Sequence, residues 1–400
     1  FSANDLEYLD RRIKSALSQW VRRDKTVPLS SEDMKSIQRA ISPSFSLLPI
    51  LFRKIEDQEE KLFRLTTDQM MMLNFLAMRK RACVKGVAGS GKTMLAQAQA
   101  EKFADAGMKT LLVCYNKTLA KWLRDNISPE YAEKITVIHF HGLCSEWCRK
   151  ANIAFKPPLR DEDKFWQEDA PDLLIDAIDY LDDKFDAVIV DEGQDFHSDW
   201  WIPLELINSA GDEGTMYVFY DPNQNLYIGQ DSTLPALGEP FNLPVNCRNT
   251  KLIAGLCSKI LDLDIPTKED APFGDEPVIL QLDSNFEIRK RVERYVHEWV
   301  NQGKLKSNQV AVLSPYKLSN SSLSSISKIK GIEVTDDMER WKAGKGILFS
   351  TVKGFKGLEA DAILLIDVPP IDEASLFKKS DYYVACSRAK HMLVVIQRNH

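Results

Sequence analysis

Gly86-Val-Ala-Gly-Ser-Gly-Lys-Thr93 is the stretch of sequence that decides the fold of this chain. It follows the phosphate-binding pattern G-x-x-x-x-G-K-[ST] without a mismatch. The apolar run at 82–87 predicts a buried strand before it, and residues 94–103 predict a helix after it. Strand, glycine-rich turn and helix is the context that the pattern requires. The stretch therefore predicts a loop at a helix N-terminus whose backbone N–H groups face a bound phosphate.

The residues of this loop have separate expected roles, and together they imply ATP and Mg²⁺ as cofactors. Glycine lacks a Cβ and tolerates positive φ, so the backbone can wrap closely around phosphates. Lys92 is expected to reach the β- and γ-phosphates, and Thr93 is expected to ligate Mg²⁺. The other residues expected to form the cradle are Gly86, Gly89, Ser90 and Gly91. The alternative is a glycine-rich turn that carries a solvated lysine.

The composition of the chain is typical of a globular protein that does not cross a membrane. Of its 400 residues 44% are hydrophobic and 28% are charged, and no apolar run is long enough to span a bilayer. Seven scattered cysteines and the absence of a leader favour a reducing compartment, so we expect a cytoplasmic protein. The net charge of −6 argues against a broad surface that coats nucleic acid, but it is compatible with a narrow basic track.

The hydrophobic pattern divides the chain into three parts. Residues 1–60 have apolar residues at helical spacing, which predicts an N-terminal helical arm without chemistry of its own. In 61–245 and again in 246–400, short β-rich apolar runs alternate with helical stretches. This alternation predicts an α/β fold with two tandem domains, each built on a parallel sheet. The serine-rich stretch at 319–327 is expected to be a flexible surface connection.

A second motif follows the apolar strand predicted at 187–190. It reads Asp191-Glu-Gly-Gln-Asp195, and acids at the end of a neighbouring strand belong at a nucleotide site. Asp191 is expected to hold Mg²⁺, and Glu192 to orient and deprotonate the attacking water. The alternative is a solvated acidic loop after a strand. A protein that only binds a nucleotide needs the first acid but not the second, so the pair favours hydrolysis.

This motif resembles the D-E-x-Q-D box of UvrD/Rep-like superfamily 1 helicases. Further segments resemble other motifs of that family, and they follow in the family's order from residue 65 to near the end. These segments lie at 65–69, 115–120, 140–144, 221–227, 246–249, 351–359 and 383–390. The resemblance implies two tandem RecA-like P-loop domains that share one ATP site.

The resemblance also implies roles for residues of that site. Gln69 corresponds to the glutamine that reads adenine, Gln224 to a sensor of the γ-phosphate, and Glu359 to a ribose contact. Arg248 and Arg388 correspond to arginine fingers that the second domain supplies in cis. A planar, permanently charged guanidinium suits the negative charge that spreads over the γ-phosphoryl oxygens during transfer.

The family's binding partner is single-stranded DNA, and the resemblance places several residues beside it. These residues are Asn116, Lys117, Phe140, His141, Tyr227 and Thr351. Lys353, Lys356, Lys378 and Lys379 are further candidates for phosphate contacts, or are simply solvated. Trp166, Trp200 and Trp201 are candidates for base stacking, although a paired tryptophan is more often packed in a core. The set His139, His141, Cys144 and Cys148 lacks the spacing of a zinc site, so no structural metal is expected.

The chain departs from full UvrD-like motor proteins in three ways. The stretches 148–187 and 248–351 leave no room for the large insertions that grip a duplex, and Cys247 replaces a tyrosine that stacks on adenine. The compact form resembles helicase cores that follow a nuclease-related (NERD) domain. We therefore expect the arm to connect to a nuclease domain or subunit.

These observations predict a nucleic-acid-dependent ATPase motor, a translocase or helicase on single-stranded DNA in repair or defence. The alternative is an ATP-driven switch that binds nucleic acid or a partner protein without separating strands. A small-molecule kinase with a P-loop would need neither the Asp-Glu-Gly-Gln-Asp box nor two distal arginines.

Overall fold

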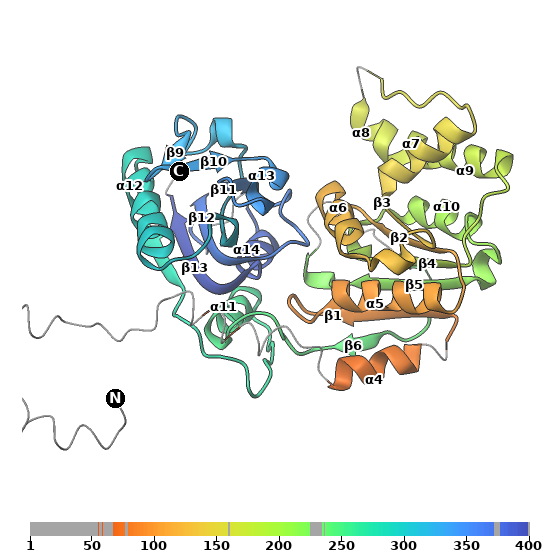
Figure 1. The fold of residues 1–400 in the computed structure, drawn as a ribbon, viewed down its shortest axis with the longest axis horizontal. Helices are drawn as coiled ribbons and strands as arrows, with labels where there is room; N and C mark the ends of the chain where they lie inside the picture. Colours follow the sequence, from red (N-terminus) through yellow and green to blue (C-terminus); the bar gives the residue numbers. More distant parts are fainter. Residues whose placement is uncertain are drawn as a thin grey trace, which may run out of the picture. The chain divides into compact units, whose positions relative to one another are not determined.

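We describe the chain from a computed structural model. The structure describes residues 55, 58, 67–76, 79–158, 161–224, 234–235, 237–371 and 377–398. Apart from Ile55 and Gln58, the arm expected at 1–60 lies outside the described residues, and so does Tyr227. The described part has an α/β fold with two sheets, as expected (Figure 1).

The first sheet is parallel throughout, and its strand order is β3-β2-β4-β5-β1-β6. Its strands are β1 (Arg81–Gly86), β2 (Thr110–Cys114), β3 (Ile135–His139), β4 (Ala187–Val190), β5 (Thr215–Tyr220) and β6 (Phe241–Leu243). The apolar runs predicted the first five, whereas β6 has three residues at the edge and carries too short a pattern to be recognised.

Helices cover both faces of this sheet because alternate strand residues face opposite sides. In β2, Leu111 and Val113 pack in one apolar cluster, and Leu112 and Cys114 pack in the other. One face carries α4 (Thr67–Leu76), α5 (Lys92–Asp105) and α6 (Lys117–Asn126). The other face carries α7 (Phe140–Lys150), α9 (Ala170–Tyr180) and α10 (Trp201–Leu206), and the short α8 (Glu162–Lys164) precedes α9. Coverage on both faces explains why the strands are apolar along their whole length.

The second sheet has the strand order β7-β13-β12-β8-β11-β10-β9. Its strands are β7 (Val278–Gln281), β8 (Val310–Ser314), β9 (Lys328–Ile329), β10 (Ile332–Thr335), β11 (Ile347–Thr351), β12 (Ala360–Val368) and β13 (Ala389–Gln397). The prediction of a purely parallel sheet is wrong at one edge, where β9 pairs antiparallel with β10. The two residues between them, Lys330 and Gly331, both have positive φ (50° and 87°), which suits a tight hairpin turn.

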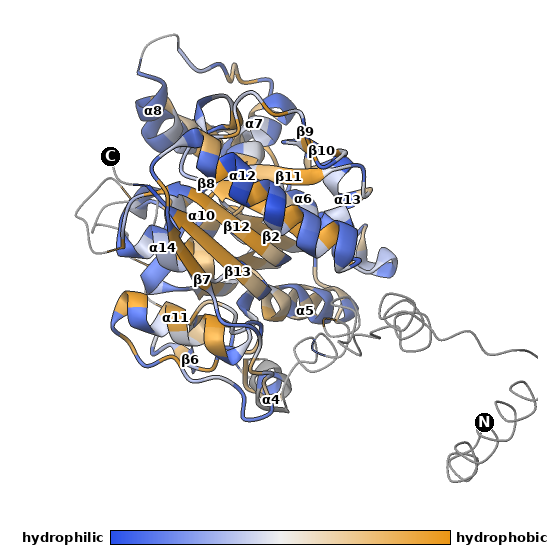
Figure 2. Cartoon of the chain, turned by 90° about the vertical axis from the view of Figure 1, so that its left-hand side faces the viewer, coloured by the Kyte–Doolittle hydropathy of each residue, from blue (hydrophilic) through white to orange (hydrophobic). Residues whose placement is uncertain are grey.

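The helices of the second half are divided between its two faces. The cluster on one face includes residues of α11 (Lys251–Leu261), α13 (Met338–Lys342) and α14 (Lys379–Cys386), and the opposite cluster includes α12 (Asn285–Val296). In Figure 2, β12 and β13 are hydrophobic along most of their length, whereas α12 is striped with hydrophilic residues. This pattern indicates a sheet covered on both faces and a helix with one face in water.

The serine-rich stretch at 319–327 is more than a surface connection, which corrects the sequence-based expectation. Ser321 and Ser322 are buried, and the Ser322 backbone N–H donates to Asp367 Oδ2 at 3.0 Å. The Ser322 hydroxyl also bonds to the Asp367 carboxylate. A buried carboxylate needs such donors, so this loop is held in place by Asp367 at the end of β12.

Two findings bear on the sequence-based expectations about composition. The seven cysteines are buried and lie outside any disulfide, in agreement with reduced thiols. Within the described part of the chain, every helix is too short or too polar to cross a bilayer.

Candidate active site

The loop from Gly86 to Thr93 joins β1 to α5 and has the backbone that its glycines predict. Gly89 and Gly91 have φ of 70° and 86°, and Gly91 caps the N-terminus of α5. A Cβ on Gly89 would lie 2.7 Å from Asn246 Oδ1, and a Cβ on Gly91 would lie 2.8 Å from Gln69 Nε2. Any side chain at either position would therefore clash as well as strain the backbone.

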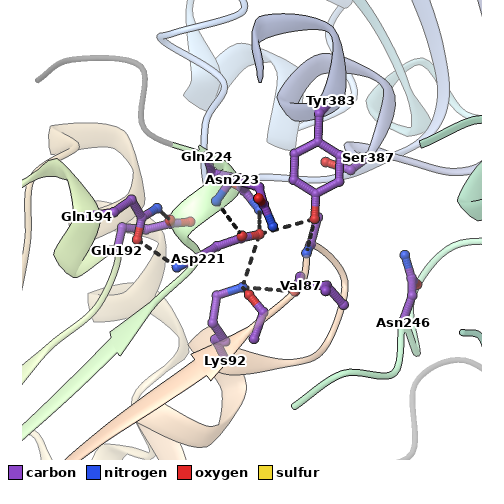
Figure 3. Close-up of polar contacts among 12 residues, drawn as sticks. Val87, Lys92, Glu192, Gln194, Asp221, Asn223, Gln224, Asn246, Tyr383 and Ser387 are labelled. Atoms are coloured by element: carbon purple, nitrogen blue, oxygen red, sulfur yellow. Dashed lines mark hydrogen bonds and ion pairs between the residues drawn. The ribbon is translucent and has the colours of Figure 1, made fainter. Parts of the chain in front are cut away.

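Lys92 is held at the mouth of this loop. Its ammonium donates to the carbonyls of Gly86 at 3.0 Å and Val87 at 2.9 Å. It also lies 3.8 Å from Asp221 Oδ2, directly after β5 (Figure 3). Lys92 is only 6% exposed, so its charge acts in a poorly hydrated site.

Asp191 is fully buried at the end of β4, next to Thr93. Its Oδ1 accepts the Glu192 backbone N–H at 3.0 Å, and its Oδ2 has no hydrogen-bond partner among the described residues. Burial, and then the Glu192 charge, raise the pKa of Asp191 to about 7, while the adjacent Thr93 hydroxyl opposes this shift. An unsatisfied carboxylate oxygen beside a hydroxyl is the oxygen donor set that Mg²⁺ prefers, so these residues fit the expected ion.

Glu192 turns the chain out of β4 with a φ of 57°, which is unusual for a residue with a Cβ. The Gln194 amide donates to its carboxylate. The positive charges of Lys356, Lys92 and Arg388 lower the pKa of Glu192 against the effect of burial. Glu192 is therefore an ionised carboxylate at neutral pH, held in a strained backbone conformation.

Two arginines reach this region from the second half. Arg388 follows α14 and is 6% exposed, and its Nη2 donates to Gln224 Oε1 at 3.4 Å. Gln224 in turn donates to Asp221 Oδ2 at 2.7 Å. Arg248 lies 3.9 Å from Glu359 Oε2 and 2.8 Å from the Met94 sulfur. Both arginines therefore approach side chains that the P-loop half supplies.

Side chains from both halves line one cavity of about 240 Å³, which we call the phosphate cavity. Of the expected ATP-site residues, it brings together Gly89, Gly91, Lys92, Thr93, Glu192, Gln224, Arg248, Glu359 and Arg388. Its wall is completed by Met94, Trp122, Gly357 and Lys390, which the motif comparison had not singled out. Trp122 is the aromatic residue among them, and it lies on the same face of α6 as Leu119, which packs against Gly357.

Gln69 lies behind the loop rather than in the wall of the phosphate cavity. Its amide donates to the Ser90 carbonyl at 2.6 Å and to the Cys247 sulfur at 3.7 Å. Cys247 is also buried, and its backbone N–H donates to the Gly89 carbonyl at 2.8 Å. In this structure Gln69 and Cys247 thus stabilise the loop by donating hydrogen bonds to its backbone carbonyls.

The first half matches a known family. Residues 69–230 match a family model described as "AAA domain", which is found in UvrD/Rep-like superfamily 1 helicases. This part of the chain is a P-loop ATPase domain. A search of curated proteins found no match to the chain. The matched residues include the loop at 86–93 and the acids after β4, whereas the second sheet lies outside the match.

A buried ion pair ties the ATPase domain to the second half, and sequence reasoning missed it. Lys356 Nζ lies 2.6 and 2.8 Å from the two oxygens of Asp195, and it also donates to the Gln224 carbonyl at 2.6 Å. Both side chains are 1% exposed, so Lys356 is neither solvated nor available to a DNA phosphate. The available signal was the last acid of the Asp-Glu-Gly-Gln-Asp box together with the lysine of Lys356-Gly-Leu-Glu359.

A second cavity, of about 640 Å³, is lined in part by Asp195 of this ion pair, and we call it the aromatic cavity. It is lined by Tyr115, His139, His141, Asp163, Trp166, Gln167, Asp195, His197, Trp200 and Lys353. The Tyr115 and Trp200 rings are stacked 5.8 Å apart, and His141 lies 3.0 Å from the Trp166 carbonyl. Burial lowers the pKa of His139 to about 4 and also lowers the pKa of His141 and His197, so these imidazoles are neutral at pH 7.

The residues expected beside single-stranded DNA have different positions. His141 lines the aromatic cavity, Lys117 is exposed, and Thr351 is half-buried on β11. Phe140 is a correction, because it is fully buried and stacks on Trp200 at 4.4 Å, so it supports the wall from behind. Asn116 caps α6, and its amide donates to the Lys353 and Lys356 carbonyls at 3.3 Å, which ties the two halves together.

The tryptophan pair after the acidic box is packed, as expected. Trp200 and Trp201 are 1% and 5% exposed. Trp200 nevertheless contributes to the wall of the aromatic cavity, and Trp166 contributes a more accessible ring.

Proposed function

We propose that the chain is a nucleic-acid-dependent ATPase motor that moves along single-stranded DNA. The observation that carries the proposal is that Arg248 and Arg388 enter the same cavity as Lys92 and Glu192. A site assembled from both halves can close on a triphosphate and loosen after hydrolysis. Such a cycle moves a strand that contacts both halves.

The chemistry follows from what phosphoryl transfer needs. Negative charge spreads over the γ-phosphoryl oxygens in the transition state, and Lys92 and Arg388 are placed to stabilise it. Mg²⁺, held by Thr93 and Asp191, would neutralise charge on the phosphate oxygens. Glu192, ionised and inside the cavity, would accept a proton from the attacking water. Gln224 contacts Arg388 and would respond to the γ-phosphate together with it.

The aromatic cavity supports the choice of a single-stranded partner. Its rings offer faces on which unpaired bases can stack, and Lys353 adds a positive charge from the second half. Asp195 lines this cavity, and Glu192, three residues earlier in the same turn, lines the phosphate cavity. A ligand bound in one cavity can therefore affect the other cavity through the short segment from Glu192 to Asp195.

A switch that binds nucleic acid or a partner without separating strands is the second candidate. The observation that favours it is the small size of the segment between α7 and β4, whose described residues form only α8, α9 and a helical turn between them. Full motor proteins of the resembled family carry a large insertion there that grips the duplex. A nuclease domain or subunit joined through the arm at 1–60, and a role in repair or defence, belong to the same proposal.

The test measures ATP turnover by the 400-residue chain alone and with single-stranded DNA, duplex DNA or RNA. Single-stranded DNA should raise turnover most. Glu192→Gln should keep nucleotide binding and lower turnover by at least about 100-fold, because it removes the base but leaves the cavity intact. The motor proposal is wrong if no nucleic acid raises the turnover of the wild-type chain. Stimulation without opening of a partial duplex would favour a translocase or the switch.

A further inference from the structure

Tyr383 of α14 is a buried tyrosine whose hydroxyl lies against the phosphate loop. The Ala88 backbone N–H donates to this hydroxyl at 2.6 Å, and the hydroxyl donates to Asp221 Oδ2 at 3.2 Å. Figure 3 shows the ring pointing from α14 toward Asp221. The side chain is fully buried, and burial raises the pKa of Tyr383 well above its usual range, so the hydroxyl remains a donor. One hydroxyl from the second half thus contacts two elements of the ATPase domain.

The loop residue Ala88 belongs to both halves. Its side chain is 1% exposed and packs in the apolar cluster of the second sheet, together with Phe355 and Tyr383. Its neighbours in the loop, Val87 and Gly89, supply a carbonyl to Lys92 and a wall residue to the phosphate cavity. The conformation of the phosphate loop therefore depends directly on how Ala88 packs against the second half.

Asp221 is the centre of a polar network that reaches three residues of the phosphate cavity. Its carboxylate accepts from Gln224 at 2.7 Å and lies 3.8 Å from the Lys92 ammonium. Its backbone N–H donates to Gln194 Oε1 at 2.9 Å, and the amide of Gln194 donates to Glu192. Figure 3 draws these contacts as one connected group. A shift of the Asp221 carboxylate would therefore move Lys92, which is expected to reach the β- and γ-phosphates, and Gln224, which is expected to sense the γ-phosphate.

We propose that Tyr383 is a positioning residue by which the second half sets the geometry of the γ-phosphate end of the ATP site. This inference rests on the proposed ATPase function and adds to it the route from α14 to the phosphate loop. Tyr383 holds Ala88 and Asp221 in register when the halves are together. Loss of the hydroxyl leaves a buried N–H without its acceptor and the Asp221 carboxylate without one donor. Because Lys92 and Gln224 depend on Asp221, the change affects recognition of a triphosphate more than that of a diphosphate.

The test compares Tyr383→Phe with Tyr382→Phe in the 400-residue chain. Tyr382 is the matched control, because it is the preceding residue of α14, is 1% exposed, and bonds through its hydroxyl to the Pro369 carbonyl, away from the loop. The probes are ADP and a non-hydrolysable ATP analogue, each with Mg²⁺, and the readouts are the two dissociation constants and ATP turnover. We expect Tyr383→Phe to weaken binding of the ATP analogue by about tenfold and to lower kcat by about tenfold. Its affinity for ADP should stay within about twofold of the wild-type value. Tyr382→Phe should change none of these by more than about twofold.

The possible outcomes separate this inference from the proposed function. A wild-type chain that binds neither nucleotide would refute both. If the wild-type chain binds and hydrolyses ATP, equal behaviour of Tyr383→Phe and the wild type would refute only the role of Tyr383. Equal losses for ATP analogue and ADP, or equal losses in the two variants, would indicate a merely structural hydroxyl and would also overturn the inference. A double variant with Asp221→Asn should lose less than the sum of the two single losses, because both changes break the same contact.

Discussion

The phosphate cavity and the aromatic cavity share a short segment of the chain, but the side chains that line them differ in kind. The phosphate cavity gathers charged groups from both halves, among them Lys92, Arg248, Arg388 and Glu192. The aromatic cavity gathers neutral rings, and the charged residues in its lining are Asp163 and Asp195 from the first half and Lys353 from the second. The first composition suits the oxygens of a triphosphate, and the second suits unpaired bases. Under the proposed function, the phosphate cavity would hold ATP and the aromatic cavity would hold single-stranded DNA.

One short segment belongs to both cavities. Glu192 lines the first and Asp195 lines the second, and a single turn of 3₁₀ helix at Gly193–Asp195 separates them. Lys356 pairs with Asp195, and its charge is the main influence that lowers the pKa of Glu192. The two cavities therefore differ in the side chains that line them, but the charge of Lys356 acts on an acid in each. Four changes, taken from the largest expected effect to the smallest, can break or sharpen this comparison.

The largest effect is expected from removing the second half's charge from the phosphate cavity. Arg388→Ala should lower ATP turnover by about 10³-fold, as for arginine fingers in general, because it removes the guanidinium that donates to the Gln224 side chain in the phosphate cavity. Nucleotide affinity should fall much less. Turnover with single-stranded DNA, measured at saturating ATP, checks this. Arg388→Lys keeps the charge but not the planar fork, so it should recover only part of the rate; a loss of merely a few-fold in Arg388→Ala would remove Arg388 from the transition state.

The second change breaks the link between the cavities. Lys356→Met leaves Asp195 buried without its partner, and such a loss typically costs about 3–5 kcal/mol of unfolding free energy. The double variant Lys356→Met/Asp195→Asn removes the unpaired charge and should recover most of that stability. If the pair couples the cavities, the double variant still hydrolyses ATP but responds less to single-stranded DNA.

Urea unfolding and stimulated turnover together decide this prediction. The control is Arg340→Met, which removes one partner of the exposed pair between Arg340 and Glu333 and should leave the urea midpoint nearly unchanged. Full stimulation in a stable double variant would show that Lys356 and Asp195 only hold the fold.

How far the sequence predicted these two cavities differs between them. The phosphate loop and the acids after β4 are local motifs on predicted strands, so their meeting at the carboxyl ends of parallel strands could be expected. The resemblance also placed Arg248, Arg388 and Glu359 at that site. The aromatic cavity was not predicted as a unit, because its rings come from the residue after β2, from β3 and α7, from the helical turn before α9 and from the segment after β4, and no sequence spacing relates them.

The same reasoning explains the individual corrections. Phe140 and His141 are neighbours, but one faces the core and the other the cavity, and an apolar motif residue gives no sign of which. Lys356 looks like any solvated lysine until a partner 161 positions away is brought to it. The β9–β10 hairpin is too short for its alternation to be recognised, although Lys330-Gly331 carried the turn signal. In each case a long-range contact decides what the local pattern leaves open.

The third change removes a ring from the aromatic cavity. Trp166→Ala should weaken single-stranded DNA binding by about tenfold, because stacking on one aromatic side chain contributes about 1–3 kcal/mol per base. Turnover without DNA should stay within about twofold, since Trp166 does not line the phosphate cavity. Fluorescence anisotropy of a labelled oligonucleotide measures the affinity, and Trp166→Phe should retain most of it. If the affinity of Trp166→Ala equals that of the wild type, DNA does not use this cavity.

The smallest effect is expected from the neutral imidazoles of the aromatic cavity, which contrast with the charged side chains of the phosphate cavity. Burial, together with the charges of His141, Lys117 and Arg124, lowers the pKa of His139 to about 4. A base whose folded-state pKa lies below its unfolded value of 6.5 stabilises the fold above pH 6.5, and this contribution is lost as the pH falls toward 4. His139→Gln keeps a polar side chain that does not titrate.

Denaturant unfolding at pH 7.5 and pH 5 measures this contribution. Between the two, the wild type should lose about 1 kcal/mol more unfolding free energy than His139→Gln, a value reduced from the full shift because the imidazole is partly exposed. Carboxylates that titrate in this range affect both proteins equally and cancel in the difference. Equal losses of unfolding free energy in the two proteins would mean that the His139 imidazole is solvated in the folded protein and that its pKa is not lowered by burial.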